Sequence, residues 1–460
     1  MSSAPPIPSV AENAVEGVGR GEDPRPVAPA PAGSLVRRLL DRATGPGADR
    51  HLFTALGAEG ERIARLTPAE LDARARAVAA ALRGTGRPGD RVIIPPMPGL
   101  DFHVAFFGCL YAGMVAVPVA DATGPAAAAI ARDCRPSAVL VAGSAPPGPS
   151  LGVARVAVRE QSPASHDRWD GPVPPAPGAP ALLQYAQRPA ERPRGLPVGH
   201  GTLAAGQAAV RDRCDIDTGT TVVSWLPLWH GTGLGTALVL PLMSGAASVT
   251  LEPAAFVRDP RVWLRAIEAE EDVFAAAPDI AYELCVRRVP AAERMRIDLS
   301  TWRVAAVGGN GGQPVRARTL RRFADAFRPG FFREEMFAAG YGPGEGALGV
   351  TLARPLYPTV SGRYDRGALA RGKAVPVPAS DRGGVELVGR GTPLPGTEVR
   401  VVDPVSYRPL PERAVGEIRV AVAGGGCDRA GTRTGDLGFL DGGELFVTGR
   451  TAWSPVWSPA

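Results

Sequence analysis

The feature that most constrains the fold is an alternation of short β-branched segments with helical ones. Arg91–Ile94 is short and β-branched, like a buried strand, and it precedes a helical stretch at 101–112 and a second strand-like run at 115–119. The same alternation returns farther along the chain, with strand-like runs at 222–225, 247–251, 273–276 and 304–307. Because strands that alternate with helices form parallel sheets, the sequence predicts an α/β protein with parallel-rich sheets.

One helix is defined by its first turn. Apolar residues recur at helical spacing between 66 and 82, directly behind Thr67, Pro68 and Glu70. Thr67 is placed to cap the helix, Pro68 to begin it, and Glu70 to reach back and complete a capping box.

Composition changes along the chain predict its organisation. The first residues alternate Ala, Pro, Ser, Gly and Glu, and they cannot bury enough apolar surface to repay their ordering. After residue 351 short strands separated by Gly and Pro, such as 398–402 and 417–422, predict a β-barrel-like unit. The predicted parts are a disordered tail (1–33), a first α/β subdomain ending in a Pro-rich linker (34–180, linker from 145), a second α/β subdomain (181–350), the β-barrel-like subdomain (351–450) and a short tail (451–460).

Charge and cysteine content exclude little. The chain has 51 basic and 46 acidic residues, a net charge of +5 that does not call for a nucleic-acid partner. Lys373 is the only lysine, so the other 50 basic residues are arginine. No run of about 18 apolar residues predicts a membrane span. The five cysteines are far apart, and their spacing fits neither a zinc site nor a disulfide framework. The first residues do not resemble a secretory signal. Both observations favour a cytoplasmic location.

Four local patterns could carry chemistry, and each has a structural alternative. Asp436 stands between glycines in 433–438, where a carboxylate can accept two hydrogen bonds from a diol or simply cap a turn. The segment 341–345 joins Tyr341 to a carboxylate, as a nucleobase and its metal would require. His230 follows a strand-like run and by itself is equally a structural histidine. By itself, 184–195 is only a polar surface loop broken by prolines.

Taken in order and at these spacings, the patterns resemble the adenylate-forming superfamily, and within it the fatty acyl-AMP ligases. The similarity runs from about residue 66 to 450, and it includes the stretches 106–113, 117–118, 224–228 and 298–302. The segment 352–389, with its core at 364–377, looks like the insertion that separates acyl-AMP ligases from acyl-CoA ligases. The resemblance therefore implies the N-terminal fold of these enzymes and delivery to an acyl carrier protein rather than to free coenzyme A.

The resemblance also implies a reaction and a set of roles. An ATP- and Mg²⁺-dependent step joins a carboxylate, such as that of a fatty acid, to AMP, and the acyl group then passes to a phosphopantetheine thiol of the carrier. His230 would lie where the acyl tunnel meets the α-phosphate, and Glu345 would bind magnesium. The remaining implied residues are nucleotide-binding Gly311, Gly312, Tyr341, Gly342, Asp436 and Arg450, and, in the acyl pocket, Trp229, Leu234 and Gly235.

The segment at the position of the family's phosphate loop departs from the pattern. That loop works because small residues let several backbone amides converge on pyrophosphate. In 186–195 two prolines lack an amide proton, and Glu191 repels phosphate. Three arginines could supply positive charge instead, although a guanidinium is placed differently from the family's lysine. They are Arg188, Arg192 and Arg194.

Two further positions and the end of the sequence also differ. Gly231 replaces an Asp and Gln313 replaces a Glu. After Arg450, where relatives continue into a mobile domain carrying a lysine, this sequence has Ala452 and Trp453.

Three hypotheses about function follow. The first is adenylation with altered parts or with a partner protein supplying that domain. The second is an ATP-independent enzyme acting on carrier-bound acyl chains, and the third is a non-catalytic acyl or carrier-binding scaffold.

Overall fold

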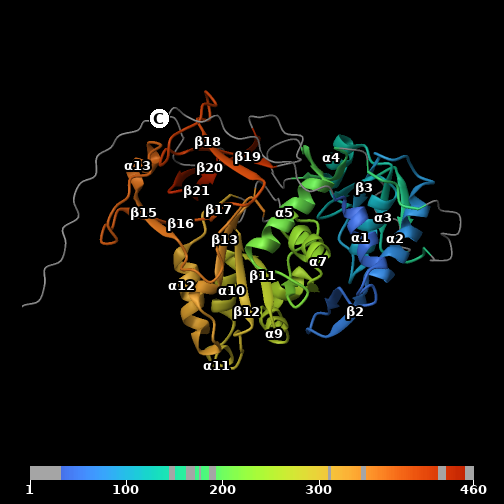
Figure 1. Ribbon diagram of the computed structural model, residues 1–460, viewed down its shortest axis with the longest axis horizontal. Helices are drawn as coiled ribbons and strands as arrows, with labels where there is room; N and C mark the ends of the chain where they lie inside the picture. The colour runs from blue at the N-terminus through green and yellow to red at the C-terminus, as the bar shows by residue number, and fades with distance from the viewer. Residues whose placement is uncertain are drawn as a thin grey trace, which may run out of the picture.

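The computed structural model describes residues 33–143, 151–161, 171–175, 178–185, 193–308, 312–342, 349–422 and 431–450. Three regions follow one another in Figure 1: the N-terminal part in blue and teal, the middle part in green and yellow, and the C-terminal part in orange and red.

The N-terminal region is built on a six-stranded sheet in the order β6-β5-β3-β4-β7-β8. Its neighbours are parallel except for the antiparallel hairpin of β7 and β8. The strands are β3 (Arg91–Ile94), β4 (Val115–Pro118), β5 (Ala138–Val141), β6 (Ala154–Ala157), β7 (Pro180–Tyr185) and β8 (Gly195–Gly199). The helices are α1 (Leu35–Thr44), α2 (Pro68–Leu82), α3 (Asp101–Tyr111) and α4 (Pro125–Cys134).

The middle region is built on a nine-stranded sheet in the order β17-β14-β13-β12-β11-β9-β10-β1-β2. Strands β1 and β9 to β13 run parallel, and β2, β14 and β17 pair antiparallel. The strands are β1 (Phe53–Leu56), β2 (Arg62–Leu66), β9 (Thr221–Ser224), β10 (Ala247–Leu251), β11 (Val273–Pro278), β12 (Trp302–Gly308), β13 (Phe337–Tyr341), β14 (Thr351–Leu352) and β17 (Thr392–Pro393).

Helices cover both faces of this sheet. One face packs on α8, α9, α10 and α12 around the buried aromatic rings of Trp263, Tyr282, Trp302 and Phe323. The other packs on α5 and α7, which lie between the two sheets in Figure 1. The helices are α5 (His200–Arg213), α6 (Gly231–Gly233), the π-helical η2 (Leu234–Val239), α7 (Leu240–Ser244), α8 (Pro253–Arg258), α9 (Arg261–Glu268), α10 (Asp279–Arg288), α11 (Ala291–Arg294), α12 (Ala317–Phe327) and the 3-10 turns η3 (Arg328–Gly330) and η4 (Glu334–Met336).

The C-terminal region is antiparallel. A four-stranded sheet has the order β18-β19-β20-β21, and a separate hairpin of β15 and β16 packs beside β21 with the short helix α13. Strands β18 and β21 are the two edges of the larger sheet, so the described residues form an open sheet rather than a closed barrel. The elements are β15 (Ser361–Asp365), α13 (Arg366–Ala370), β16 (Gly384–Val388), β18 (Thr397–Val402), β19 (Gly416–Val422), β20 (Thr432–Asp441) and β21 (Glu444–Arg450).

The sequence predicted most of these elements. The capping box of α2 is formed, with the Glu70 amide donating to Thr67 Oγ1 at 3.1 Å and the Thr67 amide to Glu70 Oε2 at 2.9 Å. The linker predicted from residue 145 contains a strand, β6, which pairs in parallel with β5. Segments also cross between the regions, because β1 and β2 join the middle sheet whereas β7 and β8 join the N-terminal one. The subdomain boundaries near residues 180 and 350 therefore stay predictions.

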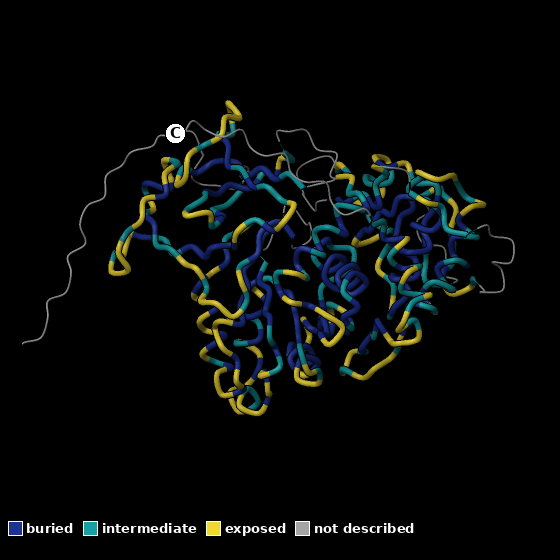
Figure 2. Tube along the Cα trace, in the orientation of Figure 1, coloured by how far each residue is buried: buried dark blue, intermediate teal, exposed yellow. Residues whose placement is uncertain are grey.

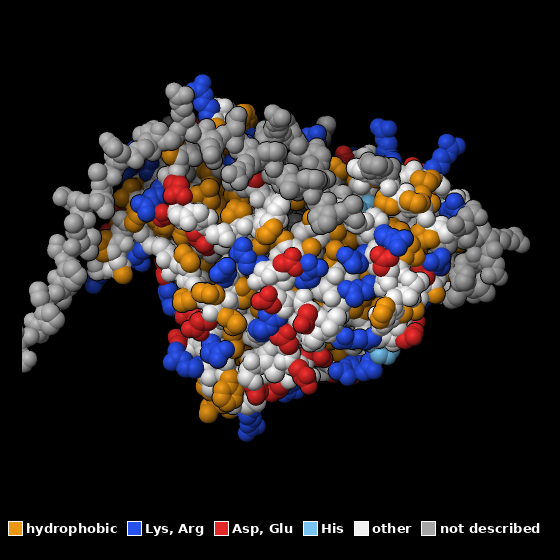
Figure 3. Space-filling model, viewed as in Figure 1, with side chains coloured by type: hydrophobic (Ala, Val, Ile, Leu, Met, Phe, Trp, Pro, Cys, Tyr) orange, Lys and Arg blue, Asp and Glu red, His pale blue; other side chains and the backbone are white. Residues whose placement is uncertain are grey.

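The core is continuous through the helices and strands, while loops supply most of the exposed chain (Figure 2). On the described part of the face in Figure 3, basic and acidic side chains are intermixed rather than gathered by sign. In the part of the chain that the structure describes, every helix is too short or too polar to cross a bilayer.

Candidate functional site

Asp436 is the centre of a buried polar cluster. It lies on β20, in register with Arg450 at the end of β21. The Tyr341 hydroxyl at the end of β13 donates to Asp436 Oδ2 at 2.8 Å, and Arg450 Nε donates to Oδ1 at 2.7 Å. The Asp436 amide donates to Thr434 Oγ1 at 3.0 Å, which fixes the local backbone. Three residues that the sequence implied for nucleotide binding therefore meet, although two regions of the fold supply them.

Gly312 closes over this cluster from the middle region. A Cβ added at Gly312 would lie 2.1 Å from Asp436 Oδ1 and 2.7 Å from Arg450 Nε, and its φ is +79°. Only glycine fits at such a position, because both the contact and the backbone conformation exclude a side chain. The bare backbone of Gly312 thus packs directly against the Asp436 carboxylate.

The cluster is closely enclosed. Asp436 is 1% exposed and Tyr341 is 4% exposed. Burial, followed by the negative charge of Asp436, holds the pKa of Tyr341 well above its ordinary value, so the phenol stays protonated and remains a donor. Each Asp436 oxygen accepts one of these side-chain hydrogen bonds, so a ribose hydroxyl would donate to a remaining lone pair of the same oxygens.

His230 begins the short helix α6 at the carboxyl end of β9. Its Nδ1 accepts a hydrogen bond from the Thr232 amide at 3.3 Å, and its ring contacts Trp229 edge-on with a centroid distance of 6.2 Å. Burial lowers the pKa of His230, so the ring is neutral at pH 7. A neutral ring whose Nδ1 accepts carries its proton on Nε2, which leaves an N–H donor for a carboxylate.

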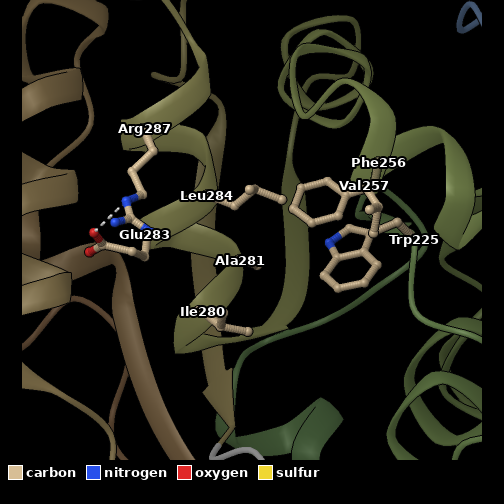
Figure 4. A pocket seen from close by; sticks show the side chains of 8 residues that line it. All are labelled: Trp225, Phe256, Val257, Ile280, Ala281, Glu283, Leu284 and Arg287. Atoms are coloured by element: carbon tan, nitrogen blue, oxygen red, sulfur yellow. Dashed lines mark ion pairs between the residues drawn. The ribbon is translucent and has the colours of Figure 1, made fainter.

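An apolar pocket of about 190 Å³ opens at the carboxyl ends of β9, β10 and β11 (Figure 4). Trp225 and Phe256 stack with centroids 4.0 Å apart on one side, and α10 forms the other. Glu283 and Arg287 stand at its rim as an ion pair, and Glu283 is also bound by Arg322 at 2.9 Å. The apolar lining consists of Trp225, Phe256, Val257, Ile280, Ala281 and Leu284.

Helix α10 also carries an ion pair at its first residue. Its first residue, Asp279, accepts from Arg316 Nε at 2.8 Å and from the Arg316 amide at 3.2 Å, and its charge acts on the buried Arg390 together with that of Asp436. The next residue, Ile280, lines the pocket. The start of α10 therefore carries an ion pair at Asp279 and an apolar pocket residue at Ile280.

The residues implied for the acyl pocket lie elsewhere. Leu234 and Gly235 are buried in η2, where Leu234 packs into the core shared with the N-terminal region. Trp229 is half-buried, and its carbonyl accepts from Gln184 at 3.4 Å. The pocket that the structure describes is lined by other residues, so an acyl role for these three stays a prediction.

The degenerate phosphate segment is described only at its ends. Arg194 is exposed and directly precedes β8. Asp133 of α4 accepts hydrogen bonds from the Tyr185 hydroxyl at 2.5 Å and from the Gly195 amide at 3.1 Å, which fixes both strands of the β7–β8 hairpin.

Of the other residues predicted to bind nucleotide, Gly342 directly follows β13. Four other predicted residues lie outside the described residues: Arg188, Arg192, Gly311 and Glu345.

Glu345, the residue expected to bind magnesium, is one of these four residues. Among the described ranges, no group of three or more His, Cys, Asp or Glu side chains is placed to hold a metal ion. The fit to a nucleoside rests instead on Asp436, Tyr341 and Gly312.

Sequence reasoning missed the apolar lining and Arg390. Two pocket residues could have been found from the rule that sites in parallel sheets lie beyond the carboxyl ends of the strands, since Trp225 ends the strand-like run 222–225 and Ile280 comes four residues after the run 273–276. Arg390 carries a weaker signal, an arginine between two glycines after the apolar strand β16.

A family model described as AMP-binding enzyme matches residues 42–425. The chain is a member of the AMP-binding enzyme family. This member is 31% identical to the long-chain-fatty-acid–AMP ligase FadD32 of Mycolicibacterium smegmatis, over 91% of its own length and 74% of the relative's. It is 30% identical to the medium-chain-fatty-acid–[acyl-carrier-protein] ligase JamA of Moorena producens, over 91% and 77% of the two chains. It therefore spans about three quarters of these relatives.

Solved structures give the same fold for this family member. A fatty acyl-adenylate ligase from L. pneumophila, in complex with acyl adenylate and pyrophosphate, superposes with a TM-score of 0.82 at 30% identity, covering 91% of this chain and 77% of that one. An adenylation domain of a keto acid-selecting NRPS module superposes with a TM-score of 0.77 at 19% identity, which shows the shared fold alone. The fold is therefore that of the N-terminal part of the fatty acyl-AMP ligases.

Proposed function

We propose that this family member forms an acyl adenylate from an aliphatic carboxylic acid and hands the acyl group to a carrier protein. The observation that carries the proposal is the buried Asp436 cluster, where Tyr341 and Arg450 meet one carboxylate, and the apolar pocket beside α10 supplies a second environment. An acyl adenylate needs both environments next to each other, because its tail is apolar and its nucleoside is polar.

In the proposed reaction a carboxylate oxygen attacks the α-phosphorus of ATP, a new C(O)O–P bond forms, and the P–O bond to pyrophosphate breaks. Asp436 would hold the ribose hydroxyls, and the backbone at Gly312 would face the base. His230, neutral with its proton on Nε2, would donate a hydrogen bond where the carboxylate meets the α-phosphate. Magnesium, when bound, would neutralise charge on the phosphates, and Glu345 would hold it.

The tail would enter the pocket between Trp225 and α10. The pocket walls are apolar, and their two aromatic members, Trp225 and Phe256, stack on each other, while the indole Nε1 of Trp225 is buried without a hydrogen bond in the described structure. The similarity to FadD32 and JamA supports a fatty acid as substrate and, for JamA, a carrier protein as acceptor.

The test is ATP–pyrophosphate exchange with a panel of fatty and aryl acids, with and without carrier proteins. We expect exchange that depends on an aliphatic acid, at a rate reduced by the altered phosphate segment. Losing one preorganised donor costs about a hundred- to a thousandfold in rate. Absence of exchange at high enzyme concentration, together with no calorimetric binding of AMP, would reject the proposal.

A second candidate is an ATP-independent enzyme acting on carrier-bound acyl chains. It is favoured by the prolines and Glu191 in 186–195 and by the enclosure of Asp436. It predicts turnover of acyl-carrier substrates without any heat of ATP binding. A scaffold without catalysis would instead bind carrier or fatty acid and turn over neither substrate.

A further inference from the structure

Arg390 is a fully buried arginine at the junction of the three segments that form the candidate nucleotide site. It follows β16, its amide donates to the Leu445 carbonyl of β21 at 2.7 Å, and its carbonyl accepts from Thr351 Oγ1 of β14 at 2.6 Å. It is 1% exposed. Its backbone is thus fixed between the strand that leads to Arg450 and the strand that pairs with β13.

The guanidinium of Arg390 has few partners for a buried charge. Nη1 donates to the Val307 carbonyl at 3.5 Å and Nη2 to the Gln313 carbonyl at 3.4 Å, both long, and Nε is buried without a hydrogen bond in the described structure. Within the described residues no carboxylate forms an ion pair with it. A buried charge that has only long hydrogen bonds and no ion pair destabilises the folded state, so we expect this arginine to serve a function.

The carboxylates whose charge acts on Arg390 are Asp279 and Asp436. Burial lowers the pKa of Arg390 to about 10, and the negative charges of these two carboxylates oppose that shift. The side chain is therefore still positive at pH 7. It offsets part of the negative charge that Asp279 and Asp436 bring into the interior.

The two carbonyls that Arg390 binds lie on either side of residues 308–312. Val307 is near the end of β12, and Gln313 directly follows Gly312, whose Cα hydrogen already lies against Asp436. A shift of the turn by a few tenths of an ångström would open or block this contact. Holding the carbonyl next to Gly312 therefore fixes the distance between the turn and Asp436.

We propose that Arg390 is a positioning residue that holds the Gly312 turn over Asp436, and with it the nucleoside half of the site. The inference rests on the proposed function for its nucleotide ligand, but the position of the turn can be measured without any ligand. Arg42 offers a matched control, because its guanidinium also donates to two backbone carbonyls, those of Leu242 and Met243 at 3.1 and 3.2 Å, in a part of the fold away from this junction.

The test compares Arg390→Met and Arg390→Lys with Arg42→Met. Calorimetry measures binding of AMP, of a non-hydrolysable acyl-AMP mimic and of decanoate. We expect Arg390→Met to weaken AMP binding at least tenfold and to leave decanoate binding within twofold. Arg390→Lys should recover part of the loss, since it keeps the charge, and Arg42→Met should change neither affinity. A purely structural role would lower both affinities together.

Hydrogen exchange of the ligand-free protein provides the second measurement. In Arg390→Met, amides in 304–308 and 312–316 should exchange faster than in wild type and in Arg42→Met. Unchanged AMP affinity in a folded Arg390→Met variant would overturn the proposal, as would unchanged exchange. If wild type binds no AMP, the proposed function fails, and exchange alone decides whether Arg390 holds the turn. If Arg390→Met does not fold, Arg390→Lys is judged by the same two measurements.

Discussion

Replacing Asp436 with Asn separates the nucleotide function of this carboxylate from its structural one. Asn has the same shape, but it offers one acceptor oxygen where Asp offers two. The oxygen can face Arg450 Nε, and the amide group then faces the Tyr341 hydroxyl, which must accept instead of donating. The variant loses one charge-assisted hydrogen bond and the negative partner of Arg450.

The magnitudes follow from the enclosure of the cluster. A hydrogen bond to a charged group contributes about 1.5–3 kcal/mol, and breaking a buried pair costs more, so we expect the free energy of unfolding to fall by about 2–4 kcal/mol. For AMP, the loss of the ribose acceptor amounts to about 3 kcal/mol, or roughly a hundredfold in Kd. Chemical denaturation measures the first quantity and calorimetry with AMP the second.

Asp272 is the matched control. Asp272 also accepts hydrogen bonds from an arginine and a hydroxyl, Arg303 Nε at 2.6 Å and Thr220 Oγ1 at 2.7 Å. It lies directly before β11, at the amino end of that strand, whereas the pocket residue Ile280 follows the carboxyl end. Asp272→Asn should lower stability and leave the Kd for AMP unchanged. If Asp436→Asn binds AMP as tightly as wild type, Asp436 is not the ribose acceptor and the assignment of the site is wrong.

Three further changes test other parts of the structure. Gly312→Ala places a methyl group 2.1 Å from Asp436 Oδ1 at a φ of +79°, so it should cost about 1–3 kcal/mol of strain and abolish AMP binding in the same calorimetric assay; retention of wild-type affinity would contradict this. Ile280→Trp narrows the apolar pocket, so decanoate should lose contacts equivalent to about two methylene groups and bind roughly tenfold more weakly. AMP binding should not change. Burial lowers the pKa of His103 to about 3, so the unfolded chain binds this proton first, and stability should fall by about 1.4 kcal/mol per unit as pH drops from about 6.5 toward 3. In urea melts His103→Leu should reduce that slope by about 1.4 kcal/mol per unit, with the slope due to the buried His200 remaining, whereas exchanging the exposed His51 for Gln should leave the slope unchanged.

The elements predicted best are those whose signals are local. The start of α2 follows from Thr67, Pro68 and Glu70, because each acts on atoms within one turn. The parallel strands follow from short β-branched runs separated by helices. By contrast, β6 is a short strand in a Pro- and Gly-rich stretch, and only its pairing with β5 makes it a strand.

The candidate site was predictable in part, through the resemblance. It brought Tyr341 and Asp436 together as one site, and the structure places them 2.8 Å apart. Their contact depends on Tyr341, at the end of β13, packing into the core of the C-terminal sheet, which no local pattern encodes. Arg390 was missed because its role depends on two carbonyls about 80 residues away, those of Val307 and Gln313. The apolar pocket was missed because its walls come from α8 and α10 as well as β9.

The exchange of strands between the two α/β sheets bears on how the protein can be divided. Strand β1 comes early in the chain, but it pairs with β10 in parallel, and β2 follows it at the edge of the middle sheet. A fragment that begins after residue 180 would expose the edge of β10, and one that ends there would leave β1 and β2 unpaired with their sheet. Neither half is a self-contained folding unit, so expression trials or swaps with relatives should keep the segment from α1 through β21 on one polypeptide.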